Sequence, residues 1–383
     1  MRHFSFLDRH KSGELFHRAP GEVPNDGDPT LLATALGATL YSPGTRPQLA
    51  RDVRTQRDLG VTSMVLCLED AIPDSEVAAA EDNVIAALRA LAEGGEDLPM
   101  VFVRVRAADQ IPSLVARLGS AHTALAGFVL PKFGEDTGED LLGEVARAGE
   151  SIGRRLWAMP VLETPEVIYR EMRVGALLAI RRLLEKHTES VLAVRIGATD
   201  LSGMFGLRRD RDLTIYDIAV VRDTIGDIVN VLGREGGWVI SGPVWEYFAG
   251  PERLFVSSLR VTPFQHADAP DGAALRSRLV QADLDRLIRE VVLDKANGLL
   301  GKTVIHPSHA PAVHALHVVT HEEYVDALEV VEGHSGVRTS SYANKMNEVR
   351  PHRRWAEGVL RRAEAFGVLR AGHTFVDVLG AYA

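Results

Sequence analysis

The stretch L-W-A-M-P-V-L-E, residues 156–163, decides the fold, because an apolar run of strand length ends in a lone carboxylate, Glu163. The turn T-P-E follows at once. Further along the chain, L-A-V-R-I-G-A-T-D (192–200) repeats the pattern and ends at Asp200. Near-continuous apolar runs are typical of parallel strands covered on both faces. The two runs therefore predict a parallel α/β protein with acidic side chains at one edge of its sheet.

Eight apolar runs are expected to form strands: 38–43, 63–69, 100–106, 127–132, 156–163, 192–200, 238–243 and 302–307. Amphipathic stretches with helical spacing lie between them. This alternation predicts a (β/α)8 TIM barrel. A doubly wound open sheet is the alternative, but no G-x-G-x-x-G follows any strand. We expect an N-terminal extension (1–30), the catalytic barrel (31–310) and C-terminal helices with a lid segment (311–383).

Composition limits the class of protein. The chain has 383 residues, 46% of them hydrophobic, which is enough to bury a large core. A formal net charge of -9 gives no general attraction to nucleic acid or to an anionic membrane. The single cysteine, Cys67, suits a reducing cytoplasm, and no apolar run reaches the length that crosses a bilayer. We expect a cytoplasmic protein without nucleic-acid or membrane partners.

Polar side chains gather where the expected strands end: Ser42, Glu69, Arg104, Arg106, Lys132, Glu163, Asp200 and His306. Barrel enzymes build their active sites at this end. Neighbouring strands lie about 4.8 Å apart, so Glu163 and Asp200 on adjacent strands would meet within reach of one ion. Carboxylates together with substrate oxygens and waters suit Mg²⁺. The competing interpretation pairs both acids with nearby arginines.

Two basic residues have an unusual position in this pattern. Arg104 lies in the apolar run V-F-V-R-V-R and must meet an anion or face a polar cavity. It could bind a substrate carboxylate, form an ion pair with Glu69 or Asp70, or do both. Lys132 is either an anion contact or a surface lysine, and nothing nearby indicates the depressed pKa of a Schiff-base lysine.

Three further patterns carry less information. The turn S-P-G-T-R-P (42–47) could cradle a phosphate through its backbone amides and Arg46, although a plain Pro/Gly turn is the simpler interpretation. The histidines near residue 310 lack the compact spacing of zinc ligands, and we expect His314 and His317 on the surface of a helix. Cys67 lies inside a strand and is expected in the core.

Seven motifs in fixed order resemble the HpcH/HpaI aldolase and citrate lyase β-subunit family: L-Y-S-P-G-T-R-P, C-L-E-D-A-I-P-D, V-F-V-R-V-R, G-F-V-L-P-K, V-L-E-T-P-E, I-G-A-T-D-L-S-G-M-F-G and G-K-T-V-I-H-P. The resemblance covers about residues 38–330. It implies an oligomeric (β/α)8 barrel with a divalent metal on Glu163 and Asp200. It also implies that Arg104 contacts a 2-oxo acid, with the catalytic acids Glu69 and Asp70 close by.

The resemblance also indicates a branch of the family. Where pyruvate aldolases have a base histidine, this chain reads L-E-D-A, as in the citryl-, malyl- and citramalyl-CoA lyases. In that branch Ser42, Gly44 and Arg46 would lie near the coenzyme A phosphates, with Lys132 as a further anion contact. The tail Y-A-N-K-M-N-E-V-R-P-H (342–352) resembles a lid that carries a catalytic acid over a neighbouring subunit's site. Glu348 stands nearest to the family's aspartate there.

The N-terminal extension and the long connection between Glu163 and Asp200 resemble a branch of predicted C–C bond lyases linked to tellurium-stress gene clusters. We expect a Mg²⁺-dependent lyase, with Mn²⁺ as an alternative, that cleaves a 3-hydroxyacyl-CoA-type substrate to a 2-oxo acid and an acyl-CoA enolate. Coenzyme A would be part of the substrate, and the protein would be a homo-oligomer, a trimer or a hexamer. Two alternatives stay open: a class II aldolase acting on free 2-oxo acids, and a non-catalytic barrel that binds a metal or oxo acid in a stress-response pathway.

Overall fold

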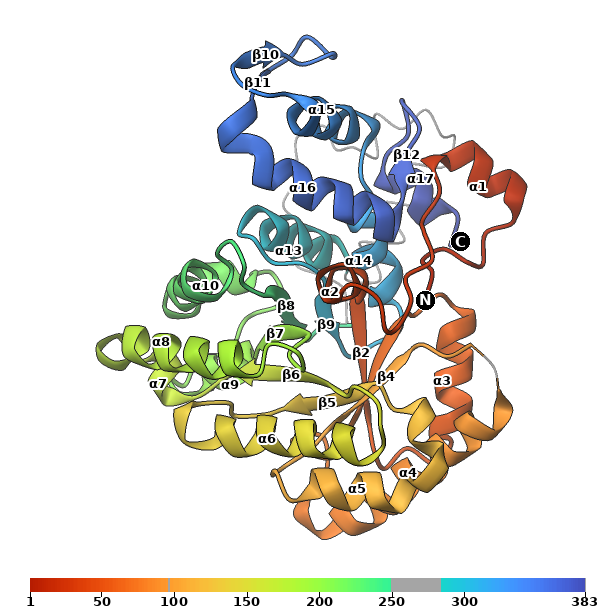
Figure 1. Cartoon of the computed structure of the whole chain (residues 1–383), viewed down its shortest axis with the longest axis vertical. Helices are drawn as coiled ribbons and strands as arrows, with labels where there is room; N and C mark the ends of the chain where they lie inside the picture. The colour runs from red at the N-terminus through yellow and green to blue at the C-terminus, as the bar shows by residue number, and fades with distance from the viewer. Residues whose placement is uncertain (96, 249–283, 383) are drawn as a thin grey trace.

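The computed structural model describes residues 1–95, 97–248 and 284–382, and its centre is a closed barrel of parallel strands (Figure 1). The strands follow one another in chain order: β2 (Ala38–Pro43), β3 (Ser63–Cys67), β4 (Met100–Arg104), β5 (Gly127–Leu130), β6 (Trp157–Leu162), β7 (Ala193–Ile196), β8 (Val239–Trp245) and β9 (Lys302–Val304). Pairing of β9 with β2, with Lys302 opposite Ala38, closes the ring. The predicted (β/α)8 barrel is confirmed.

Helices cover the outside of the barrel and bury the apolar outer face of its strands (Figure 1). They are α3 (Leu49–Asp58), α4 (Val77–Gly94), α5 (Gln110–Leu118), α6 (Glu135–Ser151), α7 (Pro165–Ile168), α8 (Arg170–Lys186), α9 (Ala198–Gly203), α10 (Ala219–Leu232), α13 (Leu284–Ala296) and α14 (His309–His317). Short 3₁₀ turns cover Asp74–Glu76, Gly119–Ala124 and Ile215–Asp217. Within the described ranges, no helix has both the length and the apolar character needed to span a bilayer.

Several strands are shorter than the sequence predicts, and one difference bears on the site. The run 192–200 was expected to be a single strand, but β7 ends at Ile196 and Asp200 lies in the first turn of α9. Gly197 separates the two elements and packs against the Glu163 side chain. Asp200 is therefore presented by a helix, one turn above the end of its strand.

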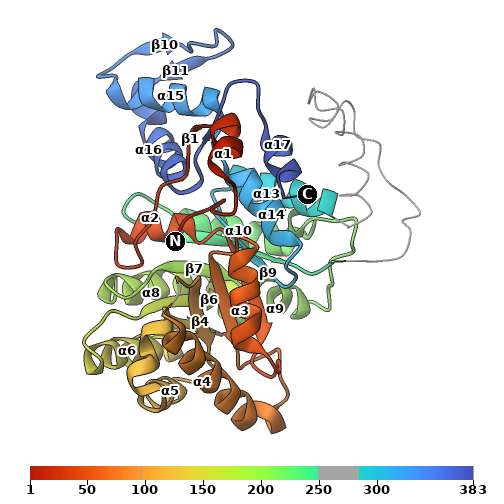
Figure 2. The same cartoon turned by 90° about the vertical axis from the view of Figure 1, so that its right-hand side faces the viewer.

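The N-terminal and C-terminal segments form one layer against the barrel. The N-terminal part contains α1 (Arg9–Leu15), β1 (Phe16–Arg18) and α2 (Pro29–Ala35); the C-terminal part contains α15 (His321–Glu332), β10 (Val337–Thr339), β11 (Met346–Glu348), α16 (Val349–Phe366), β12 (Val368–Leu369) and α17 (Phe375–Gly380). β1 pairs with β12, so the extension is tied to the C-terminal layer. In Figures 1 and 2 the β10–β11 hairpin lies at one end of the molecule, beyond α15 and α16.

His314 and His317 are buried, so the prediction that they lie on a helix surface is wrong. His314 Nε2 accepts a hydrogen bond from the Ala38 amide at 3.1 Å, and His317 Nε2 accepts one from the Gly301 amide at 3.0 Å. Burial lowers the pKa of His317 to about 3, which keeps the ring neutral and able to accept. The partners lie on distant parts of the chain, which is why helical spacing did not reveal them.

Candidate active site

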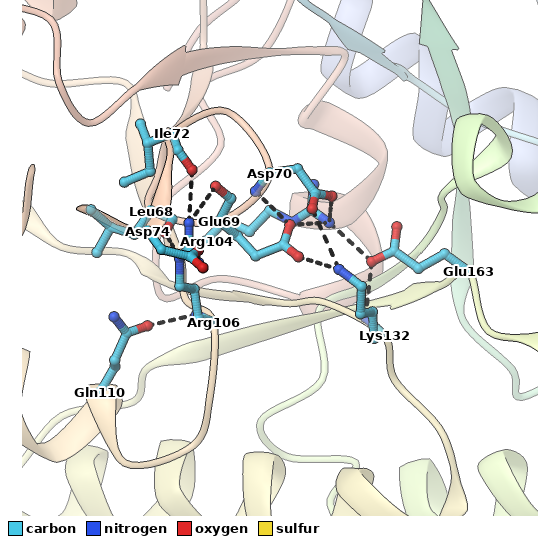
Figure 3. A network of polar contacts seen from close by, with 10 residues as sticks. All are labelled: Leu68, Glu69, Asp70, Ile72, Asp74, Arg104, Arg106, Gln110, Lys132 and Glu163. Carbon is cyan, nitrogen blue, oxygen red and sulfur yellow. Dashed lines mark hydrogen bonds and ion pairs between the residues drawn. The ribbon is translucent and has the colours of Figure 1, made fainter. Parts of the chain in front are cut away.

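The predicted site residues converge where neighbouring strands end. Glu69 and Asp70 follow β3, and Arg104 is the last residue of β4. Lys132 follows β5, and Glu163 comes directly after β6. Because these strands pair in this order, their carboxyl ends bring all five side chains to one side of the barrel mouth, as Figure 3 shows.

Arg104 is the centre of this network. Its Nη2 atom lies 2.8 Å from Glu69 Oε2, 3.2 Å from Asp70 Oδ2 and 2.9 Å from Glu163 Oε1. The predicted ion pair with Glu69 or Asp70 is therefore present, and Glu163 is a third partner. Neither Nη1 nor Nε of Arg104 has a hydrogen-bond partner among the described residues, and Nε is buried. The guanidinium thus has donors left for a ligand.

Lys132 shapes the network through its backbone as well as its side chain. Its φ of 47° lies in the left-handed region, which non-glycine residues rarely adopt. In this conformation its amide donates to Glu163 Oε1 at 2.9 Å, and its ammonium pairs with Glu69. Strained backbone of this kind is concentrated at functional sites. Burial alone would lower the pKa of Lys132, but the Glu69 carboxylate raises it, so the side chain stays charged.

The loop that carries Glu69 and Asp70 is held in place by Arg106. The guanidinium donates to the carbonyl oxygens of Leu68 at 2.7 Å and Ile72 at 2.8 Å (Figure 3). Glu69 is itself buried, and its Oε2 also accepts from the Asp70 amide at 2.8 Å. Glu69 therefore orients Arg104, Lys132 and Asp70.

Glu163 and Asp200 are the acids whose charges are least compensated. Glu163 is 2% exposed, and a Cβ on Gly197 would lie 2.1 Å from its Oε2, so Oε2 is directed toward the end of β7 and away from Arg104. Burial, with added repulsion from Asp200, raises the pKa of Glu163 to about 7 despite Arg104. Burial and the charge of Asp70 raise the pKa of Asp200 as well. No ion pair to Asp200 occurs within the described residues.

A cavity of about 400 Å³ opens beside this network. Its lining includes Ser42, Asp70, Arg104, Glu163, Arg195 and Asp200. Its walls are completed by apolar residues such as Val161 and Val244. Cavities of this size with a few convergent polar groups are typical of small-molecule sites.

The turn at residues 42–47 is only partly arranged as the sequence suggested. Ser42 is buried and lines the cavity. The amides of Gly44 and Arg46 donate to the carbonyl oxygens of Cys67 and Pro43, so they are not free to cradle a phosphate. Gly44 is required there because a Cβ would lie 3.0 Å from the Cys67 oxygen. The Arg46 side chain is exposed and bound through Nε to Asp52 at 2.6 Å.

Glu348 lies apart from the other predicted residues. It ends β11 and precedes α16, and it is exposed. It does not line the cavity, and Figures 1 and 2 show its hairpin beyond α15 and α16. Within one chain, therefore, Glu348 does not join the network, and its catalytic role stays a prediction that requires a second subunit.

Arg195 is a cavity residue that the sequence analysis passed over. It lies in β7, A-V-R-I, and is 1% exposed. A charged residue inside an apolar strand is the signal that drew attention to Arg104, and it applies equally to Arg195. Thr303 of β9 and Tyr41 of β2 line the cavity beside it.

The acids at the barrel mouth fit a divalent cation. Glu163 Oε2 and the Asp200 carboxylate face one cavity without a cationic partner. The two negative charges repel each other, and a cation bound between them would remove this repulsion. Two protein carboxylates with open positions suit Mg²⁺, which retains waters and substrate oxygens. A cluster of three or more ligating side chains does not occur in the part of the chain that the structure describes. The protein would therefore supply only part of a coordination shell.

Comparison with known proteins shows the family to which this barrel belongs. A family model described as a C–C bond lyase of the TIM-barrel fold matches residues 30–368. The chain belongs to this family, and it is an enzyme of the carbon–carbon lyase class. Its resemblance to the citrate lyase β-subunit family is confirmed, whereas no comparison supports the predicted link to tellurium-stress gene clusters. A comparison with curated proteins finds no match.

Three solved structures illustrate the shared fold. A citrate lyase from Burkholderia xenovorans LB400 has a TM-score of 0.57 at 21% identity, covering 90% of this chain and 96% of its own. CitE from Mycobacterium tuberculosis, in complex with magnesium, acetoacetate and coenzyme A, has a TM-score of 0.50 at 18% identity, covering 87% and 99%. A Haloferax volcanii malate synthase, solved as a lead(II) complex, has a TM-score of 0.50 at 13% identity, covering 73% and 72%.

Proposed function

We propose that this lyase cleaves a 3-hydroxyacyl-CoA-type thioester to a 2-oxo acid and an acyl-CoA, with Mg²⁺ as its cofactor. The observation that carries the proposal is the convergence of Glu163, Asp200 and Arg104 on one cavity at the barrel mouth. The magnesium and coenzyme A bound by the similar CitE structure support the same assignment. Mn²⁺ would suit the same two carboxylates.

Glu163 and Asp200 would hold the cation. When bound, the ion would act as a Lewis acid on the oxygens of the oxo-acid half and offset charge that develops during cleavage. Arg104 adds a fixed positive charge beside the same cavity, with Nη1 free for the oxygen that becomes the ketone. Glu69 and Lys132 keep Arg104 and Glu163 in these positions.

Cleavage requires a proton acceptor and a proton donor. The substrate hydroxyl loses its proton, the Cα–Cβ bond breaks, and the electron pair remains on the thioester half as an enolate that then takes up a proton. Asp70 faces the cavity and would accept the hydroxyl proton. Partial burial alone would raise the pKa of Asp70, but Glu69, Arg104 and Lys132 together lower it, so a carboxylate is present at neutral pH.

A covalent lysine is not needed for this reaction. Lys132 carries a raised pKa, whereas a Schiff-base lysine must lose its proton near neutral pH. Borohydride treatment in the presence of a 2-oxo acid should therefore leave the mass of the protein unchanged. A stable adduct on Lys132 would contradict the proposal.

The turn that follows Ser42 offers one contact for a coenzyme A phosphate. Arg46 is exposed and uses only Nε for Asp52, so its remaining guanidinium donors face solvent. Ser42, at the start of the same turn, lines the cavity together with Glu163 and Asp200. Arg46→Gln should raise KM for the CoA thioester while kcat changes little, because Arg46 would contact only the remote part of the substrate.

Glu348 would act across a subunit boundary in a homo-oligomer, a trimer or a hexamer. Its hairpin exposes Val337 and Met346, at 56% and 54%, which supports contact with another chain. Mixing the inactive variants Glu348→Gln and Glu163→Gln should restore part of the activity, because hybrid sites would combine an intact Glu163 with an intact Glu348 from a neighbouring subunit. Lack of restoration in a verified mixed oligomer would remove Glu348 from the mechanism.

The proposed activity is tested by incubating the protein with Mg²⁺ and a panel of citryl-, malyl- and citramalyl-CoA. Release of a 2-oxo acid is followed as its phenylhydrazone, with Glu163→Gln as the matched inactive control. Turnover of free 2-oxo acid aldols without turnover of any thioester would replace the proposal with a class II aldolase. Binding of Mg²⁺ and oxo acid without cleavage of either substrate class would indicate a non-catalytic barrel.

A further inference from the structure

Arg195 differs from the other buried cations of the protein. In the described part of the chain, buried arginines and the buried lysine have carboxylate partners: Arg173 with Asp227, Arg209 with Glu290, Arg286 with Asp212, Arg362 with Glu323, and Lys302 with Glu290 and Asp294. Arg195 is as deeply buried, yet none of the described carboxylates forms an ion pair with it. An unpaired buried charge is strongly unfavourable unless a ligand completes it.

The contacts of Arg195 are made by neutral groups from across the barrel. Nη2 donates to Thr303 Oγ1 at 2.6 Å, and Nη1 donates to Thr39 Oγ1 at 3.3 Å. Nη1 also lies 3.7 Å from the Met159 sulfur, while Nε is buried without a partner. Thr39 is fully buried and also bonds Ser63 Oγ at 3.0 Å, whereas Thr303 lines the cavity. Because Thr303 Oγ1 accepts from the arginine, the Thr303 hydroxyl proton remains available for an acceptor in the cavity.

Tyr41 completes this group. The Arg195 guanidinium lies over its ring, 5.6 Å from the centroid, and Tyr41 lines the same cavity. Burial raises the pKa of Tyr41, so its hydroxyl is neutral and can donate. Arg195, Thr303 and Tyr41 together present positive charge and hydroxyl donors, which are the groups that recognise a carboxylate.

This group lies deeper in the barrel than the proposed metal acids. Arg195 pairs with Val161, two residues before Glu163, and precedes Gly197 by two residues. At about 3.3 Å per residue, this places the Arg195 backbone roughly 7 Å below the level of Glu163. A carboxylate has its two oxygens only about 2.2 Å apart, as its covalent geometry requires. A single substrate carboxylate bound at the proposed metal site of Glu163 and Asp200 therefore cannot also contact the Arg195 guanidinium.

We propose that Arg195, Thr303 and Tyr41 form a second anion subsite at the floor of the cavity, and that the oxo-acid half of the substrate carries a second carboxylate that binds there. This inference rests on the proposed function, because it assumes that the oxo acid occupies the mouth beside Glu163 and Arg104. It narrows the substrate class to 2-oxo dicarboxylates and their aldol adducts. Monocarboxylic oxo acids would leave the positive charge of Arg195 without an anionic partner.

The test is calorimetric titration of the full-length protein with 2-oxo acids in the presence of MgCl₂. Wild type should bind oxaloacetate or 2-oxoglutarate about 10- to 100-fold more tightly than pyruvate or glyoxylate, as one charge-assisted contact predicts. Arg195→Gln should remove this preference and leave the binding of pyruvate unchanged. Arg195→Lys should retain part of it, and Thr303→Val should reduce it by roughly tenfold.

Arg154→Gln is the matched control. Arg154 likewise has no carboxylate partner among the described residues and donates to the backbone oxygens of His122 and Leu125, but it does not line the mouth cavity. This variant should keep the wild-type preference for dicarboxylates. A loss of preference in both variants would show a general effect on folding and would overturn the subsite.

Thermal unfolding separates binding from a structural role. Removing an unpaired buried charge should leave Tm unchanged or raise it, so Arg195→Gln should be at least as stable as wild type. A clear fall in Tm, with the dicarboxylate preference intact, would make Arg195 structural and overturn the inference.

The two proposals fail in different ways. If wild type binds mono- and dicarboxylic oxo acids equally and Arg195→Gln changes neither, the floor subsite is wrong and the lyase proposal stands. If no oxo acid binds with MgCl₂, but acetate binds without metal and loses about tenfold in affinity in Arg195→Gln, the proposed function fails and the anion subsite stands. Absence of both kinds of binding overturns both.

Discussion

Two networks of charged side chains lie on the same barrel, and they differ in how completely each is satisfied. The sealed network joins β9 to α13: Lys302 Nζ lies 2.9 Å from Glu290 Oε1 and 2.7 Å from Asp294 Oδ2. Arg209 adds a contact of 2.6 Å to Glu290, and the Tyr216 hydroxyl donates to Asp294 at 2.8 Å. Lys302, Glu290 and Asp294 are each no more than 1% exposed.

The network at the mouth uses the same residue types differently. Arg104 and Lys132 pair with Glu69, yet Arg104 keeps unused donors, and Asp200 has no ion pair among the described residues. Burial raises the pKa of Glu163 to about 7 and that of Asp294 in the sealed network to about 6, so the two networks differ in their unpaired groups rather than in burial alone. The sealed network holds two barrel elements together. The mouth network instead leaves hydrogen-bond donors and a carboxylate without partners, and a ligand can bind to them.

The largest effect should come from breaking the sealed network. Lys302→Met removes the lysine that two buried acids share. Leaving a buried carboxylate without its cationic partner lowers the free energy of unfolding by about 3–5 kcal/mol. Urea unfolding should show the loss, while the fraction that remains folded keeps its lyase turnover. Lys186→Met is the control, because Lys186 forms an ion pair with Glu139 that is exposed to solvent and therefore contributes little to stability. Equal stability of both variants would contradict the structural role.

The reciprocal variant at the mouth should lose activity and keep stability. Asp200→Asn removes a carboxylate that repels Glu163 and Asp70, so thermal unfolding should occur at the same or a higher temperature. Lyase turnover should fall about 10²- to 10³-fold, the range observed when one electrostatic group of an active site is lost. An Asp200→Asn protein with full Mg²⁺-dependent turnover would remove this residue from the site.

A third variant tests whether Mg²⁺ binding requires the Glu163 carboxylate to keep its present position. In Gly197→Ala the new methyl group would lie 2.1 Å from Glu163 Oε2, so the carboxylate must leave its present position. Mg²⁺ affinity, measured by calorimetry, should fall about 10- to 100-fold, as for other changes that displace a metal ligand. Gly226→Ala in α10 meets no atom within 4 Å and should leave Mg²⁺ affinity unchanged. Equal affinity in both variants would show that Glu163 is free to adjust.

The sequence predicted the barrel and most of the mouth for one physical reason. Parallel strands buried on both faces leave apolar runs, and a charged residue at the end of such a run has a defined place. Asp200 was placed on a strand because the run through Ile196 and Gly197 has no periodicity that separates a strand end from a helix start. Its convergence with Glu163 was nevertheless predicted, because both elements lead to the same edge.

Other features depended on contacts between distant segments. His314 accepts a hydrogen bond from the Ala38 amide, and no local pattern indicates that partner. Arg195 carried a readable signal, a charge inside an apolar strand, but whether that charge is compensated depends on Thr39, Met159 and Thr303 from other strands. Sequence patterns show where a charged residue lies along a strand. Whether a residue of opposite charge lies beside it depends on which strands meet in the assembled barrel.

The smallest expected effect is a pH dependence of Mg²⁺ affinity, which should depend on the mouth network and not on the sealed one. Because burial raises the pKa of Glu163 from 4.5 to about 7, the carboxyl is protonated in acid and must lose its proton to bind a cation. Mg²⁺ affinity should therefore rise roughly tenfold per pH unit up to pH 7 and level off above it. Without metal, the same raised pKa means that stability falls as pH rises from about 4.5 through 7, since the ionised form is favoured in the unfolded chain.

The control for this profile is Glu163→Gln, whose residual Mg²⁺ affinity should lose the slope below pH 7. Asp200 also has a raised pKa, so a weaker rise at lower pH should remain and should disappear in Glu163→Gln combined with Asp200→Asn. Lys302→Met should keep the wild-type profile, because none of Lys302, Glu290 and Asp294 lines the cavity. A wild-type affinity that is flat from pH 5.5 to 8 would mean that Glu163 is ionised throughout, and the contrast between a satisfied and an unsatisfied network would then lose its electrostatic basis.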